Sequence, residues 1–319
     1  MERAKLATFE QVRRYSTCSA IVAIVLSLIF NSWIGSSTLN WQVVLAAVAL
    51  AIGIPHGALD HLVTLPKSSP AKMAAFIAGY VAIALVAVAA ILNWNKWGFI
   101  GVVLMSAVHF GIGDSAFLSE LKQLGDKSRS MASTWAYAAA SGAIPVVIPL
   151  VNDRSASALN EVNPALLQWD GGYSDQILIL VIAITVIAVG ILLKHRELRD
   201  VADIVILLLL VICAPPLVAF ATYFGCWHAM RHTARLSSLL PKSVAHYSAG
   251  KPAAAFRASI IPGLPALVGT FIFVIVLGLT SSENLSDRFL WLTLVTIWAL
   301  TVPHMIVTAR LDRAALKKP

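Results

Sequence analysis

The sequence predicts an all-α fold: a polytopic integral membrane protein with about ten transmembrane helices and both termini in the cytoplasm. Hydrophobic residues make up 58% of the 319 residues and charged residues only 13%, about half the usual share in a soluble domain. Apolar stretches of roughly 20 residues, the length that crosses a bilayer, recur along the chain. Because no long polar segment separates them, residues 1–319 are predicted to form a single membrane domain.

Hydropathy and helix-breaking residues define the predicted spans in chain order. Nearly uncharged stretches give the first six spans and the last two. The seventh and eighth come from one apolar run that Pro215 and Pro216 interrupt, because proline lacks a backbone N–H and clashes with the preceding turn. The predicted spans are residues 17–35, 41–63, 73–93, 97–118, 131–151, 175–193, 200–214, 217–239, 262–280 and 289–310.

The basic residues support this topology. With a cytoplasmic N-terminus and ten spans, 21 of the 24 lysines and arginines fall on the cytoplasmic side, and only Lys96, Arg154 and Arg288 fall on the outer side. This is the bias that the positive-inside rule describes. The net charge of +8 then reflects topology and attraction to anionic membrane lipid, so it gives no reason to expect nucleic-acid binding.

Histidines are the most informative residues inside the predicted spans. An ionisable ring is costly in hydrocarbon and marks a functional site, and imidazole is a common ligand of transition metals. On the predicted topology five of these rings, from four spans, fall at a similar depth toward the cytoplasmic side, while His61 lies nearer the inner interface. We therefore expect a metal site within the helix bundle. The six histidines in the spans are His56, His61, His109, His228, His232 and His304.

A pair of histidines on the eighth span fits such a site. His228 and His232 are four residues apart, so a helix places both rings on one face, as in the helices of zinc proteases. Arg231 lies between them in the sequence. We expect its side chain on another face of the helix, toward the inner interface or a lipid phosphate.

Two carboxylates accompany the histidines. Asp60 follows His56 by four residues, and Asp114 follows His109 by five. A carboxylate that accepts the N–H of a ligating histidine fixes the tautomer of the ring, and we expect this role for both aspartates. Two alternatives remain open: Asp60 pairs with His61, and Asp114 lies at the membrane surface.

Four motifs, PHGALDH at residues 55–61, HFGIGD at 109–114, WHAMRH at 227–232 and the late PH at 303–304, resemble the bacteriorhodopsin-related-protein (Brp/Blh-type) family of β-carotene 15,15′-dioxygenases. The resemblance runs from about residue 50 to residue 305. It implies an integral membrane enzyme that splits the central double bond of β-carotene with O₂ and yields two retinal molecules. It also implies non-heme Fe(II) bound by His56, His109, His228 and His232, with His61 and His304 placed beside the metal or in the substrate pocket.

The expected substrate agrees with an intramembrane site. β-Carotene is a hydrocarbon about as long as a bilayer is thick, so it resides in membrane lipid, and we expect an apolar pocket beside the metal. Phe110 and Trp227 are the candidates to line it, because each adjoins a predicted ligand. The resemblance further implies a bacterial or archaeal cell membrane and a functional link to a retinal-binding rhodopsin.

Two other classes of function remain open at this stage. Membrane di-iron desaturases and hydroxylases also use histidines near the cytoplasmic face, but they need about eight or more ligands and an HxxHH cluster. This chain has eight histidines in total and no HxxHH. A transporter of metal ions or protons could also carry a layer of histidine and aspartate, although it would favour inverted repeats, and no clear repeat is visible.

Overall fold

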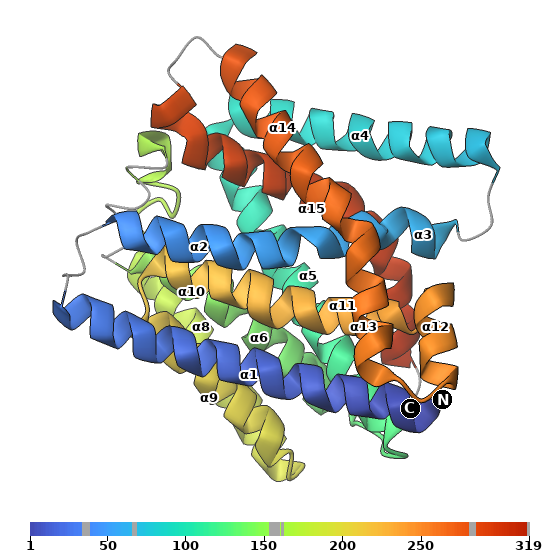
Figure 1. The fold of residues 1–319 in the computed structure, drawn as a ribbon. Helices are drawn as coiled ribbons and strands as arrows, with labels where there is room; N and C mark the ends of the chain where they lie inside the picture. Colours follow the sequence, from blue (N-terminus) through green and yellow to red (C-terminus); the bar gives the residue numbers. More distant parts are fainter. Residues whose placement is uncertain (34–38, 66–68, 153–159, 161–162, 281–284, 318–319) are drawn as a thin grey trace.

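The computed structural model describes the whole chain except residues 34–38, 66–68, 153–159, 161–162, 281–284 and 318–319. Helices dominate the described part, and no strand occurs in it (Figure 1). The predicted all-α fold is therefore confirmed. The α-helices are α1 (Glu2–Trp33), α2 (Leu39–Gly53), α3 (Asp60–Thr64), α4 (Pro70–Asn93), α5 (Asn95–Leu124), α6 (Met131–Val151), α8 (Ser174–Lys194), α9 (Leu198–Cys213), α10 (Pro216–Thr222), α11 (Met230–Ser237), α12 (Pro241–Ser248), α13 (Pro252–Ile260), α14 (Leu264–Thr280) and α15 (Leu285–Lys317).

Four short segments of other helix types connect these α-helices. They are the 3₁₀ helices η1 (Ile54–Leu59), η2 (Pro164–Leu166) and η4 (Ile261–Gly263), and the π-helix η3 (Tyr223–Ala229). Two of the predicted spans therefore contain a change of helix type. The predicted span 41–63 comprises α2, η1 and α3, and the predicted span 217–239 comprises α10, η3 and α11. Both interruptions carry predicted metal ligands.

Seven helices of the described chain are long and apolar enough to cross a membrane. Each overlaps a predicted span, while three predicted spans, 41–63, 200–214 and 217–239, are helical but shorter or interrupted. The total of ten transmembrane helices thus stays a prediction. The seven helices are Glu2–Trp33, Pro70–Asn93, Asn95–Leu124, Met131–Val151, Ser174–Lys194, Pro252–Ile272 and Trp291–Leu316.

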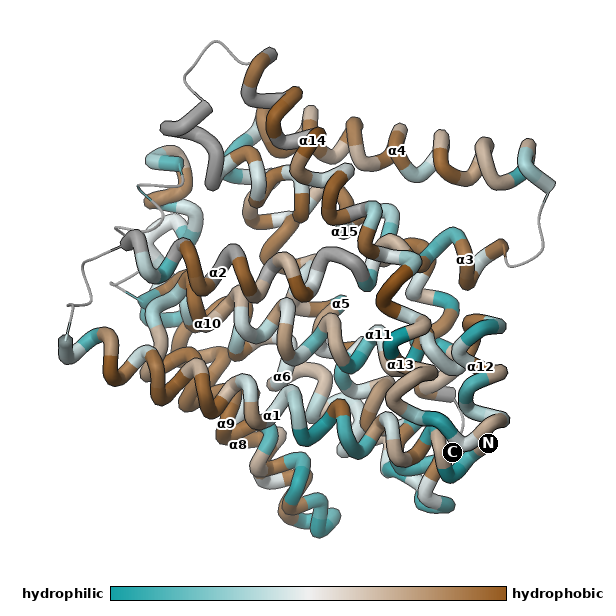
Figure 2. The backbone as a smooth tube through the Cα atoms, in the orientation of Figure 1, coloured by the Kyte–Doolittle hydropathy of each residue, from teal (hydrophilic) through white to brown (hydrophobic). Residues whose placement is uncertain are grey.

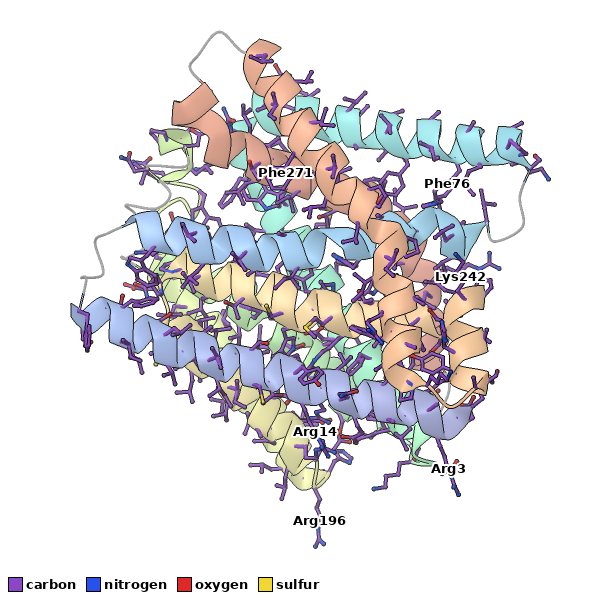
Figure 3. The ribbon with its side chains drawn as sticks, viewed as in Figure 1. Arg3, Arg14, Phe76, Arg196, Lys242 and Phe271 are labelled. Carbon is purple, nitrogen blue, oxygen red and sulfur yellow. The ribbon has the colours of Figure 1, made fainter. Side chains whose placement is uncertain are left out.

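Polar and apolar residues are separated along the length of the bundle. Hydrophilic residues gather at the end that carries α12, α13 and both chain ends, and at the turn between α8 and α9, whereas hydrophobic residues cover most of the rest (Figure 2). The labelled basic side chains Arg3, Arg14 and Arg196 lie in the lower part of the view, and Lys242 lies at its right (Figure 3). Residues that the positive-inside count assigns to one side therefore share one end of the molecule. That this end faces the cytoplasm remains a prediction.

Close approach of two backbones fixes α5 against α6. A Cβ atom on Gly111 would lie 2.0 Å from the carbonyl oxygen of Ala138, and a Cβ atom on Gly142 would lie 2.0 Å from that of Ala107. Small residues allow membrane helices to pack this tightly. Since α5 also carries His109 and Asp114, the contact sets the position of part of the predicted site.

Gly142→Ala is expected to lower the thermal unfolding temperature of the detergent-solubilised protein. The new methyl group would collide with the α5 backbone, and overpacking of this kind costs about 1–3 kcal/mol. Gly190→Ala is the matched control, because Gly190 is exposed on α8 and a Cβ atom there meets no atom within 4 Å. An equal unfolding temperature for the two variants would show that the α5–α6 contact does not limit stability.

Candidate metal centre

Four segments of the chain bring five histidines together in the interior. His56 lies on η1, His109 on α5, His228 and His232 on η3 and α11, and His304 on α15. These elements contact one another near the middle of the bundle (Figure 1). Each of the five side chains is buried, with at most 6% of its residue surface exposed. The sixth histidine of the predicted spans, His61, is only partly buried and lies on α3.

Local chain geometry allows the rings to approach. The 3₁₀ segment η1 has a proline in its first turn, which lacks the backbone N–H that would continue the hydrogen-bond ladder of α2. Gly57 follows His56, and a Cβ atom there would make only an ordinary contact with the His304 ring. Glycine is required at Gly225 on η3, because a Cβ atom there would lie 1.7 Å from the carbonyl oxygen of Ala49. Glycine therefore lets α2 and η3 pack closely beside the histidines.

Four of the rings form a closed cycle of contacts, and the fifth touches all four. In the order His56, His228, His109, His304 and back to His56, neighbouring ring centres lie 5.9, 5.1, 5.1 and 5.0 Å apart. The ring centre of His232 lies 5.1–6.4 Å from each of the others. The five rings, which we call the histidine cluster, therefore form one compact group of neighbouring side chains.

The spacing of the histidine cluster is compatible with a metal ion. A metal–nitrogen bond of about 2.1 Å puts the centre of a ligating imidazole roughly 3 Å from the ion, so two rings on one ion lie on the order of 4–6.5 Å apart. The observed separations fall within this range. As the side chains stand, no three described histidine, cysteine, aspartate or glutamate side chains are already placed to hold one ion, so binding would draw the rings inward.

Several ring nitrogens of the histidine cluster lack hydrogen-bond partners. These buried atoms are Nε2 of His109, Nε2 of His228, both nitrogens of His232 and Nε2 of His304. A buried polar atom without a partner costs about 1–3 kcal/mol, and in native proteins such atoms call for a specific explanation. Unprotonated imidazole nitrogens are good donors to first-row transition metals. A metal at the centre of the cluster would give these nitrogens a partner.

In two of these rings, His228 and His304, the Nδ1 atom contacts a carboxylate that also accepts a hydrogen bond from a tyrosine. Nδ1 of His228 lies 3.2 Å from Oδ1 of Asp114, and the hydroxyl of Tyr223 donates to Oδ2 of Asp114 at 3.0 Å. Asp114 is fully buried on α5. A carboxylate in this position accepts Nδ1–H and leaves Nε2 unprotonated toward the cluster.

His304 has the same arrangement on the opposite side of the cycle. Its Nδ1 lies 2.8 Å from Oδ2 of Asp60, and the hydroxyl of Tyr80 donates to the same oxygen at 3.1 Å. Asp60 thus supports a histidine that lies 244 positions away in the sequence. The Nδ1 atom of His56 instead contacts the backbone carbonyl of Gly53.

Arg231 departs from its expected position. Its guanidinium is fully buried, not directed to the inner interface, and it donates to Asp203 at 3.2 Å, to Tyr137 at 3.1 Å and to Ser16 at 3.1 Å. The guanidinium carbon also lies 3.8 Å from the ring centre of Trp227. The expectation was wrong because hydropathy does not reveal the acidic partner that another helix supplies.

An open cavity adjoins the histidine cluster, and we call it the site cavity. Its lining includes His56, His109, His304 and the aromatic side chains Tyr80, Phe110 and Phe224. Phe110 thus lies where the sequence analysis expects a pocket residue. Trp227, the other aromatic candidate, is not among the lining residues of the site cavity and stacks against Arg231 instead.

Comparison with known proteins identifies the family of this chain. Residues 47–312 match the family model described as Beta-carotene 15,15'-dioxygenase. The chain belongs to this family. The matched range contains the whole histidine cluster, as well as Asp60 and Asp114. The resemblance drawn from the sequence motifs is therefore confirmed, and the chain is a member of a family of carotenoid-cleaving dioxygenases.

Individual relatives cover most of the chain. It is 30% identical over 276 residues to a protein of uncultured marine bacterium 66A03 named beta-carotene 15,15'-dioxygenase, with 82% of this chain and 90% of that protein covered. Two probable beta-carotene 15,15'-dioxygenases of Halobacterium salinarum, Blh and Brp, are 25% and 24% identical to it. The Blh match covers 84% of both chains, and the Brp match covers 83% of this chain and 81% of that protein. No solved structure gives a significant match.

Tyr80 and Tyr223, the partners of the two aspartates, were not predicted from the sequence. Tyr80 is the one tyrosine of the predicted span 73–93, and Tyr223 lies five residues before His228. A hydroxyl inside an apolar helix usually finds a buried partner. The isolated tyrosine was therefore a usable signal, although it could not show which carboxylate the hydroxyl would meet.

Proposed function

We propose that this chain cleaves the central 15,15′ double bond of β-carotene with O₂ and releases two molecules of retinal inside the membrane. The observation that carries the proposal is the histidine cluster, in which five buried rings lie within contact distance and carry ring nitrogens without hydrogen-bond partners. The names of the relatives supply the substrate. The reaction balances as C₄₀H₅₆ plus O₂ to two C₂₀H₂₈O, so that each aldehyde receives one oxygen atom.

The cofactor in this proposal is non-heme Fe(II), held by His56, His109, His228 and His232. His304 is equivalent to His228 in burial, in its carboxylate partner and in its unpartnered Nε2, so we include it as a fifth ligand. When bound, Fe(II) supplies the activation of O₂.

The protein contributes orientation and the exclusion of water. Asp114 and Asp60 hold the Nδ1–H atoms of His228 and His304, which directs the Nε2 lone pairs of both rings to the centre. Phe110 and Phe224 give the site cavity an apolar wall beside the cluster. A polyene can lie against these rings without losing favourable hydration, since it has no polar group to desolvate.

The same proposal places the protein in a bacterial or archaeal cell membrane, where membrane lipid delivers β-carotene. The seven long apolar helices of the described chain support a membrane location. The product, retinal, is the chromophore of retinal-binding rhodopsins. We therefore propose a functional link to a rhodopsin as the consumer of the product.

Expression in a bacterial strain that accumulates β-carotene is expected to bleach the orange cells and to yield retinal in the extract. Absorbance of the pigment and chromatography of retinal measure the two effects. His195→Ala is the matched positive control, because His195 is exposed in the connection between α8 and α9. Orange cells without retinal, despite full-length protein in the membrane fraction, would overturn the proposal. A change in membrane fatty acids instead would favour the desaturase alternative.

A further inference from the structure

A second apolar cavity lies beyond the site cavity. Side chains from α5, α6, η2, α10 and α15 line it, and all of them are apolar except Ser106. The proposed reaction at the histidine cluster does not use these side chains. The residues that line this second cavity include Phe99, Val102, Val146, Leu166, Phe220 and Trp298.

The two cavities follow each other along the same two helices. On α5 the lining passes from Phe99 and Val102 in the second cavity to His109 and Phe110 in the site cavity. On α15 it passes from Leu294 to His304 in the same way. The second cavity is therefore a neighbour of the site cavity along these helices and is lined mainly by residues further from the histidine cluster.

Three phenylalanine rings stand between the cavities. Phe220 lines the second cavity, whereas Phe110 and Phe224 line the site cavity. Their ring centres lie 5.9–6.5 Å apart, and Phe220 and Phe224 are stacked with an angle of 17° between their planes. A polyene reaches the second cavity only when these rings turn aside. It would then lie against their aromatic faces.

The distance from the histidine cluster to the far end of the second cavity can be counted along both helices. Phe99 precedes His109 by ten residues, and Leu294 precedes His304 by ten residues. At about 1.5 Å per residue, each path is roughly 15 Å long. A C₄₀ carotenoid is about as long as the hydrocarbon core of a bilayer, roughly 30 Å. The distance from the histidine cluster to the far end of the cavity thus equals about half of the molecule.

Large side chains bound the far end. The ring centre of Phe99 lies 5.8 Å from that of Trp169 and 5.4 Å from that of Trp298. Leu166 of η2 is fully buried beside them. These side chains would stop the cyclic end group of a carotenoid at this depth.

We propose that the second cavity binds one ring-ended half of the carotenoid, and that its depth places the central double bond at the histidine cluster. The assignment rests on the proposed function. The depth of the second cavity is then the property that selects the central bond, because a symmetric substrate inserted to this depth presents its midpoint to the histidine cluster.

Val102→Phe tests the proposal by filling the second cavity. Two substrates are compared with purified protein: β-carotene and an apocarotenal from which one ring end has been removed. The variant is expected to lower kcat/KM for β-carotene by at least about tenfold, the discrimination that a shape change in an apolar pocket commonly produces. It should change kcat/KM for the truncated substrate by less than about threefold, because the end without a ring still fits the shortened cavity.

Val211→Phe is the control for overpacking alone. Val211 on α9 is as deeply buried as Val102 and lines neither cavity, so any preference it creates between the substrates should be small. If Val102→Phe does not fold, Val146→Phe enters the same cavity from α6 and gives the same comparison. Equal losses on both substrates, or no loss on β-carotene in a folded variant, would overturn the proposal.

Failure of the proposed function has a separate signature. In that case the wild-type protein cleaves neither substrate. Binding of β-carotene to the purified protein then tests the assignment of the second cavity. The absorbance of β-carotene that co-purifies with the wild-type protein should fall in Val102→Phe and persist in Val211→Phe. Co-purification that is equal in both variants would overturn the cavity assignment on its own.

Discussion

His228→Ala is expected to abolish both iron binding and carotene cleavage. The Nε2 atom of His228 is buried without a hydrogen-bond partner, so removing the ring deletes a donor that no neighbour replaces. The alanine variant also leaves the Asp114 carboxylate without its histidine. Metal analysis of the purified protein and retinal in carotene-producing cells measure the two losses. We expect the same result for His56→Ala, His109→Ala, His232→Ala and His304→Ala.

His195→Ala separates these effects from general damage to a membrane protein, since that exposed histidine lies outside the cluster. It should retain iron and activity. His304→Ala is the most informative member of the series, because the sequence motifs alone suggest four ligands. The iron content of His304→Ala should fall as far as that of His228→Ala. Unchanged iron content and activity in any member of the series would remove that residue from the ligand set.

Asp114→Asn is expected to weaken iron binding by about 10–100-fold, the usual cost of losing the partner that orients a metal-binding histidine. The neutral amide no longer favours the tautomer of His228 that carries hydrogen on Nδ1. Titration against a competing iron chelator measures the change. Asp60→Asn should have a similar effect, because Asp60 holds His304 with the same geometry.

Tyr223→Phe is the matched control for the Asp114 variant. It removes only the hydrogen bond that the phenol donates to Oδ2 of Asp114 and leaves the contact between the carboxylate and His228 in place. We therefore expect a smaller loss of iron affinity than in Asp114→Asn. If both variants bind iron as tightly as the wild type, the carboxylate does not tune the metal site.

The meeting of the histidines at one level of the helix bundle is the part of the site that the sequence could predict. Hydropathy and the distribution of lysine and arginine give the order and direction of the helices, and position along each helix then gives the level of each histidine. Five rings from four segments meet as that reasoning requires. The i to i+4 spacing likewise predicts that the rings of His228 and His232 are neighbours, and they are stacked with centres 6.0 Å apart.

Rotation of each helix about its axis is the part that the sequence could not predict. Asp60 follows His56 by one turn, yet the carboxylate contacts His304 on α15. The interruption at η1 changes the direction in which His56 and Asp60 point, and hydropathy is insensitive to a change from α to 3₁₀ geometry. The π-helix η3 is hidden from the sequence for the same reason. Packing between helices that are distant in the sequence decides which of their faces meet. A single sequence does not show this packing.

The position of Arg231 has a consequence for how the chain is assembled during synthesis. An arginine in the middle of a membrane helix costs about 2.5–3.5 kcal/mol on insertion scales. Its partners Ser16, Tyr137 and Asp203 all precede it in the chain. On the predicted topology, the helices that carry these partners are already in the membrane when the ribosome delivers this segment.

His304 enters with the last helix, α15. The histidine cluster therefore closes only when translation is almost complete. On the proposed function, iron held by all five rings would be loaded only after the full chain has been inserted.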